Sequence, residues 1–298
     1  MKFLREIRDR SIKGHGVVDG RKQQEKIISK DATSLAVSME AVILTEKIDA
    51  LEGKDVMVVD IPGAYLSADM DGEMPVVFRG TLEEIIVAAN AALYRQCVSY
   101  ETVKAVLYVR LKKALYGCLK SALLFYEKLV GDIESYVFRI NSYDPCMANN
   151  MVGRKQLTVC WHLDDLDISC IDANKITKMI HWIESQYGEM HGSSRKKHDY
   201  LGMWLDYLIP GEVRISMEEY LKGVLDNVPK EITEIPKTPA ASNLFNFRDN
   251  NKRELLDKTR AQAFHHAVAQ LLFTGVRCRN DKQTSIAFLA TRLRNPYK

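Results

Sequence analysis

The chain has 298 residues, of which 46% are hydrophobic and 27% are charged, and its formal net charge is +3. This size and composition predict a folded protein with two or three subdomains, each with a core of its own. The mildly basic charge is too small to indicate nucleic-acid binding by itself. No apolar run is long enough to span a membrane, and the charged start of the chain does not resemble a signal peptide, so we expect an intracellular protein.

The first element with a clear pattern is a helix. Residues 1–32 are polar, basic and punctuated by glycine, and a helical repeat then covers residues 33–51 and ends at Gly53. The repeat places four apolar residues near one face: Leu35, Met39, Val42 and Ile43. An apolar strand follows and ends in Asp60, which on its own indicates a turn residue or a helix cap.

The rest of the chain alternates short strands and helices. We predict, in chain order, a strand at 75–78, a helix at 82–93, a strand at 106–109, helix over much of 111–140, a helix at 173–187, strands at 200–207 and 213–217, a helix at 217–228, and further helices after a linker rich in proline and asparagine. The helix at 173–187 carries an apolar stripe that we expect to pack in the core: Ile176, Met179, Ile180 and Ile183.

The most informative stretch covers residues 158–169, where two adjacent acids interrupt an apolar pattern. It predicts two short strands joined by a tight turn, with Asp164 and Asp165 at the tip. Adjacent carboxylates repel each other, and Mg²⁺, which prefers carboxylate oxygen, is the usual ion that offsets the repulsion. With Asp60 as a third acid, such strands can hold two metal ions for phosphoryl transfer. Each motif alone is weak, because adjacent acids more often form a solvated turn.

Six cysteines are scattered along the chain without Cys-x-x-Cys spacing, and we expect them to be reduced thiols. Cys160, His162 and Cys170 lie near one another in the sequence, but no fourth ligand follows at a familiar spacing. We therefore do not expect a zinc site.

Three segments follow one another in a characteristic order: Asp60-Ile-Pro-Gly-Ala-Tyr65, the segment 111–126 that begins Leu111-Lys-Lys-Ala-Leu-Tyr-Gly117, and His162-Leu-Asp-Asp165. The first resembles the leading catalytic motif of reverse transcriptases, and the last resembles their aromatic-x-Asp-Asp hairpin. The middle segment is similar to a helix motif specific to Ty1/copia retrotransposons. Further landmarks of that class are Asp144-Pro-Cys146, Tyr200-Leu-Gly-Met203 and residues 264–272. The resemblance thus covers nearly the whole chain.

The resemblance implies an α+β fold arranged as a right-hand polymerase. Its parts would be fingers, a palm whose antiparallel sheet is backed by helices, a thumb, and the start of a connection region. The implied ranges are 1–55 for partial fingers, 56–210 for the palm with a fingers insertion at about 75–110, 211–235 for the start of the thumb, 236–260 for a linker and 261–298 for a helical connection segment. We expect a chain cut at both ends, because RNase H and integrase regions accompany this part in full-length polyproteins.

The resemblance also implies roles in two-metal nucleotidyl transfer. Asp60, Asp164 and Asp165 would be the catalytic acids and would hold two Mg²⁺ ions, with Mn²⁺ as a substitute and the backbone carbonyl of Ile61 as a further ligand. Asp165 would be the weaker ligand, or a turn carboxylate of electrostatic value only. Nucleotide binding would fall to Tyr65, Arg21, Lys22, Gly117, Lys120 and Ser121, and primer contact to His162 and Leu163.

Two of these roles have a direct physical basis. The ring of Tyr65 would clash with a ribose 2′-hydroxyl and so favour deoxynucleoside triphosphates. Arg21 and Lys22 would contact the triphosphate, since a guanidinium or an ammonium suits phosphate oxygens. The implied partners are an RNA or DNA template with its primer and deoxynucleoside triphosphates, in a cytoplasmic particle or the nucleus. No membrane partner is implied.

The chain departs from the family pattern in three places, one of which is the missing proline after Arg279 in the segment 277–282. His162 stands where these elements usually have tyrosine, and residues 119–123 lack the usual glutamine, proline and arginine. None of these changes removes a catalytic carboxylate. Two other interpretations stay open. One is an inactive retroelement remnant that at most binds nucleic acid, and the other is an unrelated metal-dependent nuclease built on the same three acids.

Overall fold

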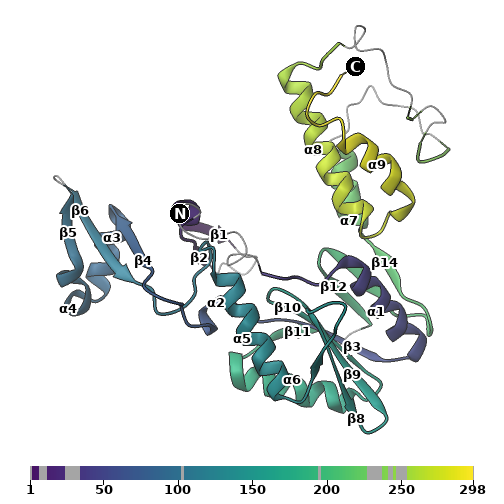
Figure 1. Ribbon diagram of the computed structural model, residues 1–298, viewed down its shortest axis with the longest axis horizontal. Coiled ribbons are helices and arrows are strands. Elements are labelled where there is room, and N and C mark those ends of the chain that lie inside the picture. The colour runs from purple at the N-terminus through teal and green to yellow at the C-terminus, as the bar shows by residue number, and fades with distance from the viewer. Residues whose placement is uncertain are drawn as a thin grey trace. The chain divides into compact units, whose positions relative to one another are not determined.

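The computed structural model describes residues 2–6, 12–23, 34–101, 104–193, 196–226, 237–240, 244–245 and 254–297. Figure 1 labels the helices and strands along the chain, which divides into two compact units. Residues 1–37, 59–168 and 174–192 form the first unit, and residues 38–58, 169–173 and 193–298 form the second. Both units contain helices and strands, so the fold belongs to the α+β class, as predicted.

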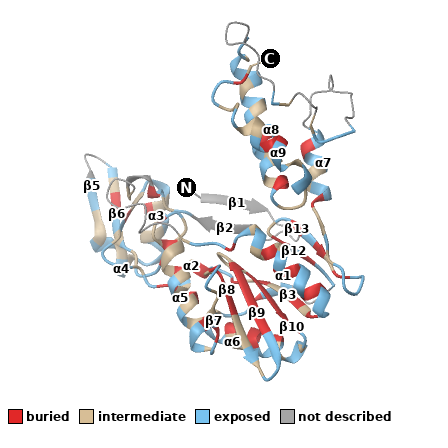
Figure 2. Ribbon diagram, turned by 45° about the vertical axis from the view of Figure 1, so that its right-hand side comes forward, coloured by how far each residue is buried: buried red, intermediate tan, exposed pale blue. Residues whose placement is uncertain are grey.

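The largest sheet has six strands in the order β11-β3-β10-β9-β8-β7. These strands are β3 (Asp55–Asp60), β7 (Arg139–Ile140), β8 (Met147–Val152), β9 (Lys155–His162), β10 (Asp165–Cys170) and β11 (His191–Ser193). Buried residues concentrate on β9 and β10 (Figure 2), and Trp161, Leu166 and Ile168 are among the most buried side chains. The apolar alternation on either side of the acidic pair therefore forms the centre of this sheet.

Helix α6 (Ala173–Tyr187) begins and ends where the sequence predicts. Its four stripe residues are all buried: Ile176, Met179, Ile180 and Ile183. The predicted amphipathic period is confirmed, because one face of the helix packs in the core.

Helix α5 (Ser121–Ser135) is shorter than predicted. The prediction covers much of residues 111–140, but residues 111–120 form turns and loop. The helix ends at Tyr136, whose ring lies 4.6 Å from the ring of Trp182 on α6. The segment before α5 carries two of the predicted nucleotide-binding residues, Gly117 and Lys120, so its loop conformation matters for the site.

A second sheet of three strands belongs to the first unit and has the order β4-β6-β5. Its strands are β4 (Pro75–Arg79), β5 (Val98–Glu101) and β6 (Lys104–Arg110), and helix α3 (Thr81–Ala89) packs against β4 and β6. The predicted helix over 82–93 is wrong as one element. Asn90 has a φ of −151° and its side chain accepts a hydrogen bond from the N–H of Leu93, which starts the separate helix α4 (Ala91–Tyr94).

The remaining elements of the first unit are short. They are the hairpin of β1 (Lys2–Glu6) and β2 (Ile12–Gly16), the 3-10 helices η1 (Gly20–Gln23) and η3 (Arg95–Cys97), and helix α2 (Ala64–Ser67). Helix α2 packs against α5.

The second unit contains a three-stranded antiparallel sheet and several helices. The elements are β12 (Lys197–Tyr200), β13 (Met203–Asp206), β14 (Arg214–Ser216), α7 (Glu218–Asp226), α8 (Lys258–Gly275), η5 (Asn280–Lys282) and α9 (Gln283–Ala290). The sequence predicts one strand over 200–207, which is wrong. The chain reverses at Leu201 and Gly202, both at positive φ, and β12 pairs with β13 as a hairpin.

Helix α1 (Met39–Glu52) also belongs to the second unit and is well defined at both ends. The hydroxyl of Ser38 accepts a hydrogen bond from the N–H of Ala41 at 3.3 Å, which caps the amino end. Gly53, at a φ of 64°, ends the helix as predicted. The cap explains why the helix begins later than the predicted residue 33.

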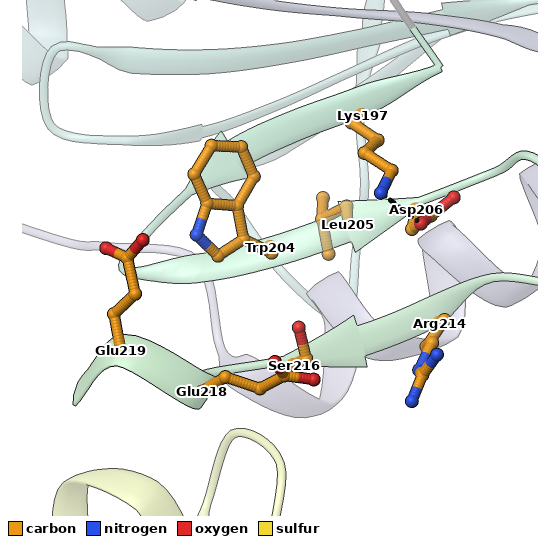
Figure 3. A pocket seen from close by; sticks show the side chains of 8 residues that line it. All are labelled: Lys197, Trp204, Leu205, Asp206, Arg214, Ser216, Glu218 and Glu219. Carbon is orange, nitrogen blue, oxygen red and sulfur yellow. Dashed lines mark ion pairs between the residues drawn. The ribbon is translucent and has the colours of Figure 1, made fainter. Parts of the chain in front are cut away.

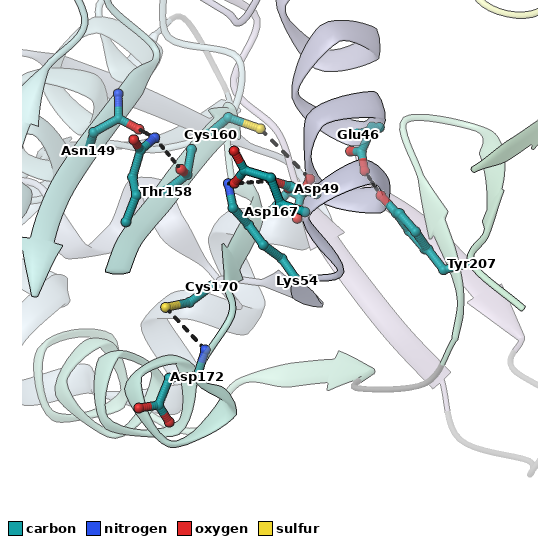
Figure 4. Close-up of polar contacts among 12 residues, drawn as sticks. Glu46, Asp49, Lys54, Asn149, Thr158, Cys160, Asp167, Cys170, Asp172 and Tyr207 are labelled. Atoms are coloured by element: carbon teal, nitrogen blue, oxygen red, sulfur yellow. Dashed lines mark hydrogen bonds and ion pairs between the residues drawn. The ribbon is translucent and has the colours of Figure 1, made fainter. Parts of the chain in front are cut away.

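The burial of α1 differs from the predicted apolar face. Its buried residues are Val42, Thr45, Glu46, Asp49 and Ala50. Of the predicted face, Val42 is buried, Met39 and Ile43 are half-buried, and Leu35 is exposed. Glu46 accepts a hydrogen bond from the hydroxyl of Tyr207, and Asp49 pairs with Lys54 at 2.9 Å (Figure 4). Polar pairs as well as apolar packing therefore hold α1 in its unit.

All six cysteines are free thiols, as predicted. Within the described ranges, none of the helices combines the length and the apolar character that crossing a bilayer requires.

Candidate active site

The predicted acidic hairpin is present between β9 and β10. Strand β9 ends at His162, Leu163 and Asp164 form the turn, and Asp165 begins β10. Leu163 has a φ of 59°, in the left-handed region, which costs a residue with a Cβ about 1–2 kcal/mol. These four residues are half-buried, while the strands on either side lie in the core. The tip of the hairpin is thus accessible on a rigid base.

Asp60 lies beside this hairpin because β3 neighbours β10 in the sheet. The N–H of Ile61 donates to the main-chain carbonyl of Asp164 at 3.0 Å, so the end of β3 is tied to the turn. Ile61 is fully buried, and its own carbonyl accepts a hydrogen bond from the N–H of Ala64 at 3.2 Å. The predicted role of this carbonyl as a metal ligand therefore stays a prediction.

Tyr116, which has no role in the sequence-based prediction, links the acids to Tyr65. Its hydroxyl donates to Oδ2 of Asp164 at 3.2 Å, and its ring stacks on that of Tyr65 with the centroids 4.3 Å apart. Burial first, then the negative charge of Asp164 and more weakly that of Asp60, raises the pKa of the Tyr116 hydroxyl. Burial followed by Asp164 also raises the pKa of Tyr65. Asp60, Asp164, Tyr65 and Tyr116 therefore form one group, which we call the tyrosine–aspartate group.

The loop that carries Tyr116 lies against an amino-terminal segment. The N–H of Val18 donates to the carbonyl of Tyr116 at 2.8 Å. Two glycines permit this approach, since a Cβ on Gly117 would lie 2.0 Å from the oxygen of Val18, and a Cβ on Gly20 would lie 2.2 Å from the oxygen of Gly117. Gly117 also has a φ of 92°, which side-chain-bearing residues rarely adopt.

Gly117, Lys120 and Ser121, three of the predicted nucleotide-binding residues, lie on or at the end of this loop. Lys120 forms an ion pair with Asp71 at 3.1 Å. The buried hydroxyl of Ser121 accepts from the N–H of Leu115 at 3.0 Å and donates to the carbonyl of Leu115 at 2.8 Å. Ser121 thus shapes the loop from inside.

The other two predicted nucleotide contacts, Arg21 and Lys22, lie in helix η1. Their side chains fall outside the described atoms, so their predicted contact with a triphosphate stays a prediction. The backbone of η1 lies beside the loop, because Oε1 of Gln23 accepts a hydrogen bond from the N–H of Leu119 at 2.9 Å.

The acidic side chains at the strand ends can be compared with the ligands that Mg²⁺ usually has in proteins. Among the residues that the structure describes, no three His, Cys, Asp or Glu side chains come together to hold a metal ion, so the metal site of Asp60, Asp164 and Asp165 stays a prediction. Mg²⁺ usually keeps several waters and is bound through one or two carboxylates together with substrate phosphates. Asp60 and Asp164, two acids on neighbouring strands, are the kind of ligand pair that such a site uses.

A separate hollow of about 210 Å³ lies in the second unit (Figure 3). It is lined by Lys197, Trp204, Leu205, Asp206, Arg214, Ser216, Glu218 and Glu219. Lys197 pairs with Asp206 at 3.0 Å, and the lining mixes both signs of charge, so it has no evident preference for phosphate. The predicted site residues do not line it.

Nearly half of the chain is similar in sequence to retrotransposon polyproteins. Over 142 residues, or 46% of the chain, it is 27% identical to the Transposon Ty1-DR1 Gag-Pol polyprotein of Saccharomyces cerevisiae. It is 26% identical over 142 residues to the truncated transposon Ty1-A Gag-Pol polyprotein of the same yeast. The matched region spans only 8% and 11% of these two proteins. No model of a known protein family matches the chain.

Solved structures give weaker likenesses. A foamy viral protease–reverse transcriptase in complex with double-stranded DNA aligns with 98% of this chain and 43% of its own, at 10% identity and a TM-score of 0.37. A telomerase from Candida tropicalis aligns with 91% of this chain and 43% of its own, at 11% identity and a TM-score of 0.36. TM-scores of this size do not establish a shared fold.

Proposed function

We propose that the chain is an RNA-directed DNA polymerase domain of a copia-type retroelement. The observation that carries the proposal is the tyrosine–aspartate group at the ends of neighbouring strands. All four of its residues lie in the segments that resemble reverse-transcriptase motifs. The partial sequence similarity to Ty1 Gag-Pol polyproteins supports the same class of protein.

The proposed reaction joins a primer 3′-hydroxyl to the α-phosphorus of a nucleotide and releases pyrophosphate. Bound Mg²⁺ ions would supply charge that activates the hydroxyl and offsets the charge on the leaving group. Asp60 and Asp164 would hold these ions with the carbonyl of Ile61, and the bond between Ile61 and Asp164 would keep the two strand ends together. Tyr65 would exclude nucleotides that carry a 2′-hydroxyl.

The remaining assignments follow from the same proposal. The six-stranded sheet would belong to the palm, and the sheet of β4, β5 and β6 would be the insertion in the fingers. His162 and Leu163 would contact the primer end, since both lie at the accessible hairpin tip. The substrates would be a template with its primer and deoxynucleoside triphosphates, with Arg21 and Lys22 near the triphosphate.

The test is a primer-extension assay with an RNA template and Mg²⁺. We expect Asp164→Asn to lower nucleotide incorporation by at least about a hundredfold, which is the scale seen when a main electrostatic group is removed, because an amide oxygen does not replace a charged ligand. Asp69→Asn is the matched control. It removes an exposed acid that pairs with Lys113 at 2.7 Å and should leave incorporation near the wild-type rate.

The same assay separates the alternatives. Retained activity in Asp164→Asn would rule out the proposed site. Mg²⁺-dependent cleavage of a labelled RNA strand, in place of primer extension, would identify a nuclease. Binding of primer–template with neither reaction would identify an inactive remnant.

A further inference from the structure

Tyr116 contacts two predicted site residues with different parts of its side chain. Its hydroxyl donates to Oδ2 of Asp164 at 3.2 Å, and its ring stacks on Tyr65 with the planes inclined by 29°. We propose that Tyr116 is a positioning residue that orients the Asp164 carboxylate toward a metal ion and holds the Tyr65 ring in place beside the nucleotide sugar. This inference rests on the proposed polymerase function.

Hydrogen bonds hold the backbone around Tyr116, and this fixes the position from which its side chain extends. The N–H of Val18 holds the Tyr116 carbonyl at 2.8 Å. On the preceding residue, both the N–H and the carbonyl of Leu115 bond to the buried hydroxyl of Ser121. Moving the backbone of Tyr116 away from Asp164 would break these hydrogen bonds. The loop therefore keeps the tyrosine side chain in place.

The hydroxyl matters because a carboxylate can rotate about its Cβ–Cγ bond. The backbone of Asp164 is already fixed by the N–H of Ile61 at 3.0 Å, and Tyr116 adds a restraint on the side chain. The bond engages Oδ2 and leaves Oδ1 for a ligand. Partners that orient metal-binding side chains typically raise metal affinity by about tenfold to a hundredfold.

The ring matters because Tyr116 is one of two aromatic neighbours of Tyr65. Its centroid lies 4.3 Å from that of Tyr116 and 5.9 Å from that of Phe125. Removing the Tyr116 ring would take away the closer neighbour and let Tyr65 turn. The hydroxyl and the ring of Tyr116 therefore have separable effects, one on metal affinity and one on sugar selectivity.

The first experiment measures Mn²⁺ binding without nucleic acid, from the electron paramagnetic resonance signal of the free ion. Tyr116→Phe, which removes only the hydroxyl, should bind Mn²⁺ at least about tenfold more weakly than the wild type. 4-Aminophenylalanine at position 116 restores a donor and should recover most of the affinity. Tyr126→Phe is the control and should bind as the wild type does, because its hydroxyl donates elsewhere, to the Pro145 carbonyl at 3.3 Å.

The second experiment measures the preference for deoxyribonucleotides over ribonucleotides. Tyr116→Phe keeps the ring stack and should keep the wild-type preference. Tyr116→Leu removes the ring and should lower the preference by about threefold or more, the scale of one aromatic pair. A loss of preference in Tyr116→Phe equal to that in Tyr116→Leu would contradict the separation of the two effects.

Mn²⁺ binding by Tyr116→Phe that is as tight as in the wild type, or tighter, would overturn the inference. Asp164→Asn in the same titration separates this failure from a failure of the proposed function. If Asp164→Asn also binds as the wild type does, the proposed metal site itself is wrong. Circular dichroism checks each fold, and Tyr116→Leu, which also lacks the hydroxyl, takes the place of Tyr116→Phe in the titration if the latter does not fold.

Discussion

Gly117→Ala should release the amino-terminal segment from the loop that carries Tyr116. Gly117 has a φ of 92°, and a non-glycine residue at positive φ costs about 1–2 kcal/mol. An alanine Cβ would also lie 2.0 Å from the Val18 oxygen, which no real contact allows. The two segments must then separate, and the hydrogen bond from Val18 to Tyr116 is lost at a further cost of about 0.5–1.5 kcal/mol. The expected total is about 1.5–3.5 kcal/mol.

Two other glycines separate these contributions. Gly153 has a φ of 71°, and no atom lies within 4 Å of the place that a Cβ would occupy, so Gly153→Ala should show the conformational cost alone, about 1–2 kcal/mol. Gly20→Ala should show the cost of the steric clash alone, because its Cβ would lie 2.2 Å from the Gly117 oxygen and Gly20 has no positive φ. The comparison therefore isolates the contact between the two segments.

The assay is hydrogen exchange at the Val18 amide, which donates to the Tyr116 carbonyl at 2.8 Å. Gly117→Ala and Gly20→Ala should both speed this exchange, while Gly153→Ala should leave it unchanged. Denaturant unfolding gives the matching free energies. Continued protection of Val18 in both Gly117→Ala and Gly20→Ala would refute the docking of the two segments, and with it the anchored position of Tyr116.

Two predictions concern the proposed reaction directly. Tyr65→Val should raise ribonucleotide incorporation relative to deoxyribonucleotide, because it removes the ring that would meet the 2′-hydroxyl, and unchanged selectivity with lower stability would instead make Tyr65 a core residue. Affinity for primer–template should fall as salt rises, since contacts from lysine and arginine to phosphate release counterions. A titration that is flat with salt would contradict binding to the nucleic-acid backbone.

Local sequence patterns predict the elements whose own period decides their packing. The apolar stripe of α6 is buried as the 3.6-residue period requires. The alternation on either side of Asp164 and Asp165 predicts the hairpin and its turn, and Asp60 ends the neighbouring strand. For these elements, nearby residues carry enough information to fix both the structure and the positions of the acids.

The predictions fail where a distant partner decides the local structure. Residues 111–117 have a helical pattern, but the approach of Val18 and the positive φ of Gly117 turn the chain before α5 begins. Tyr116 gains its place in the site from its packing on Tyr65, which no local period reports. The sequence signal that could have pointed to Tyr116 is its place next to Gly117 in the middle motif.

The buried face of α1 is a further case. Apolar residues such as Leu35 and Val42 predict one face, yet Leu35 is exposed and the helix buries the acids Glu46 and Asp49 beside Val42. Buried charged groups require partners, and those partners are Tyr207 and Lys54. Because Tyr207 is distant in the sequence, amphipathicity alone does not identify the buried face.

The contact between Glu46 and Tyr207 also sets an order of events while the chain is being made. The two residues are 161 positions apart. Synthesis proceeds at about 5–20 residues per second, so Tyr207 leaves the ribosome about 10–30 s after Glu46. Throughout this interval Glu46 on α1 lacks Tyr207, the residue that donates a hydrogen bond to it in the folded unit. This contact therefore forms only after Tyr207 has been made, although α1 is the first helix of the second unit to be synthesised.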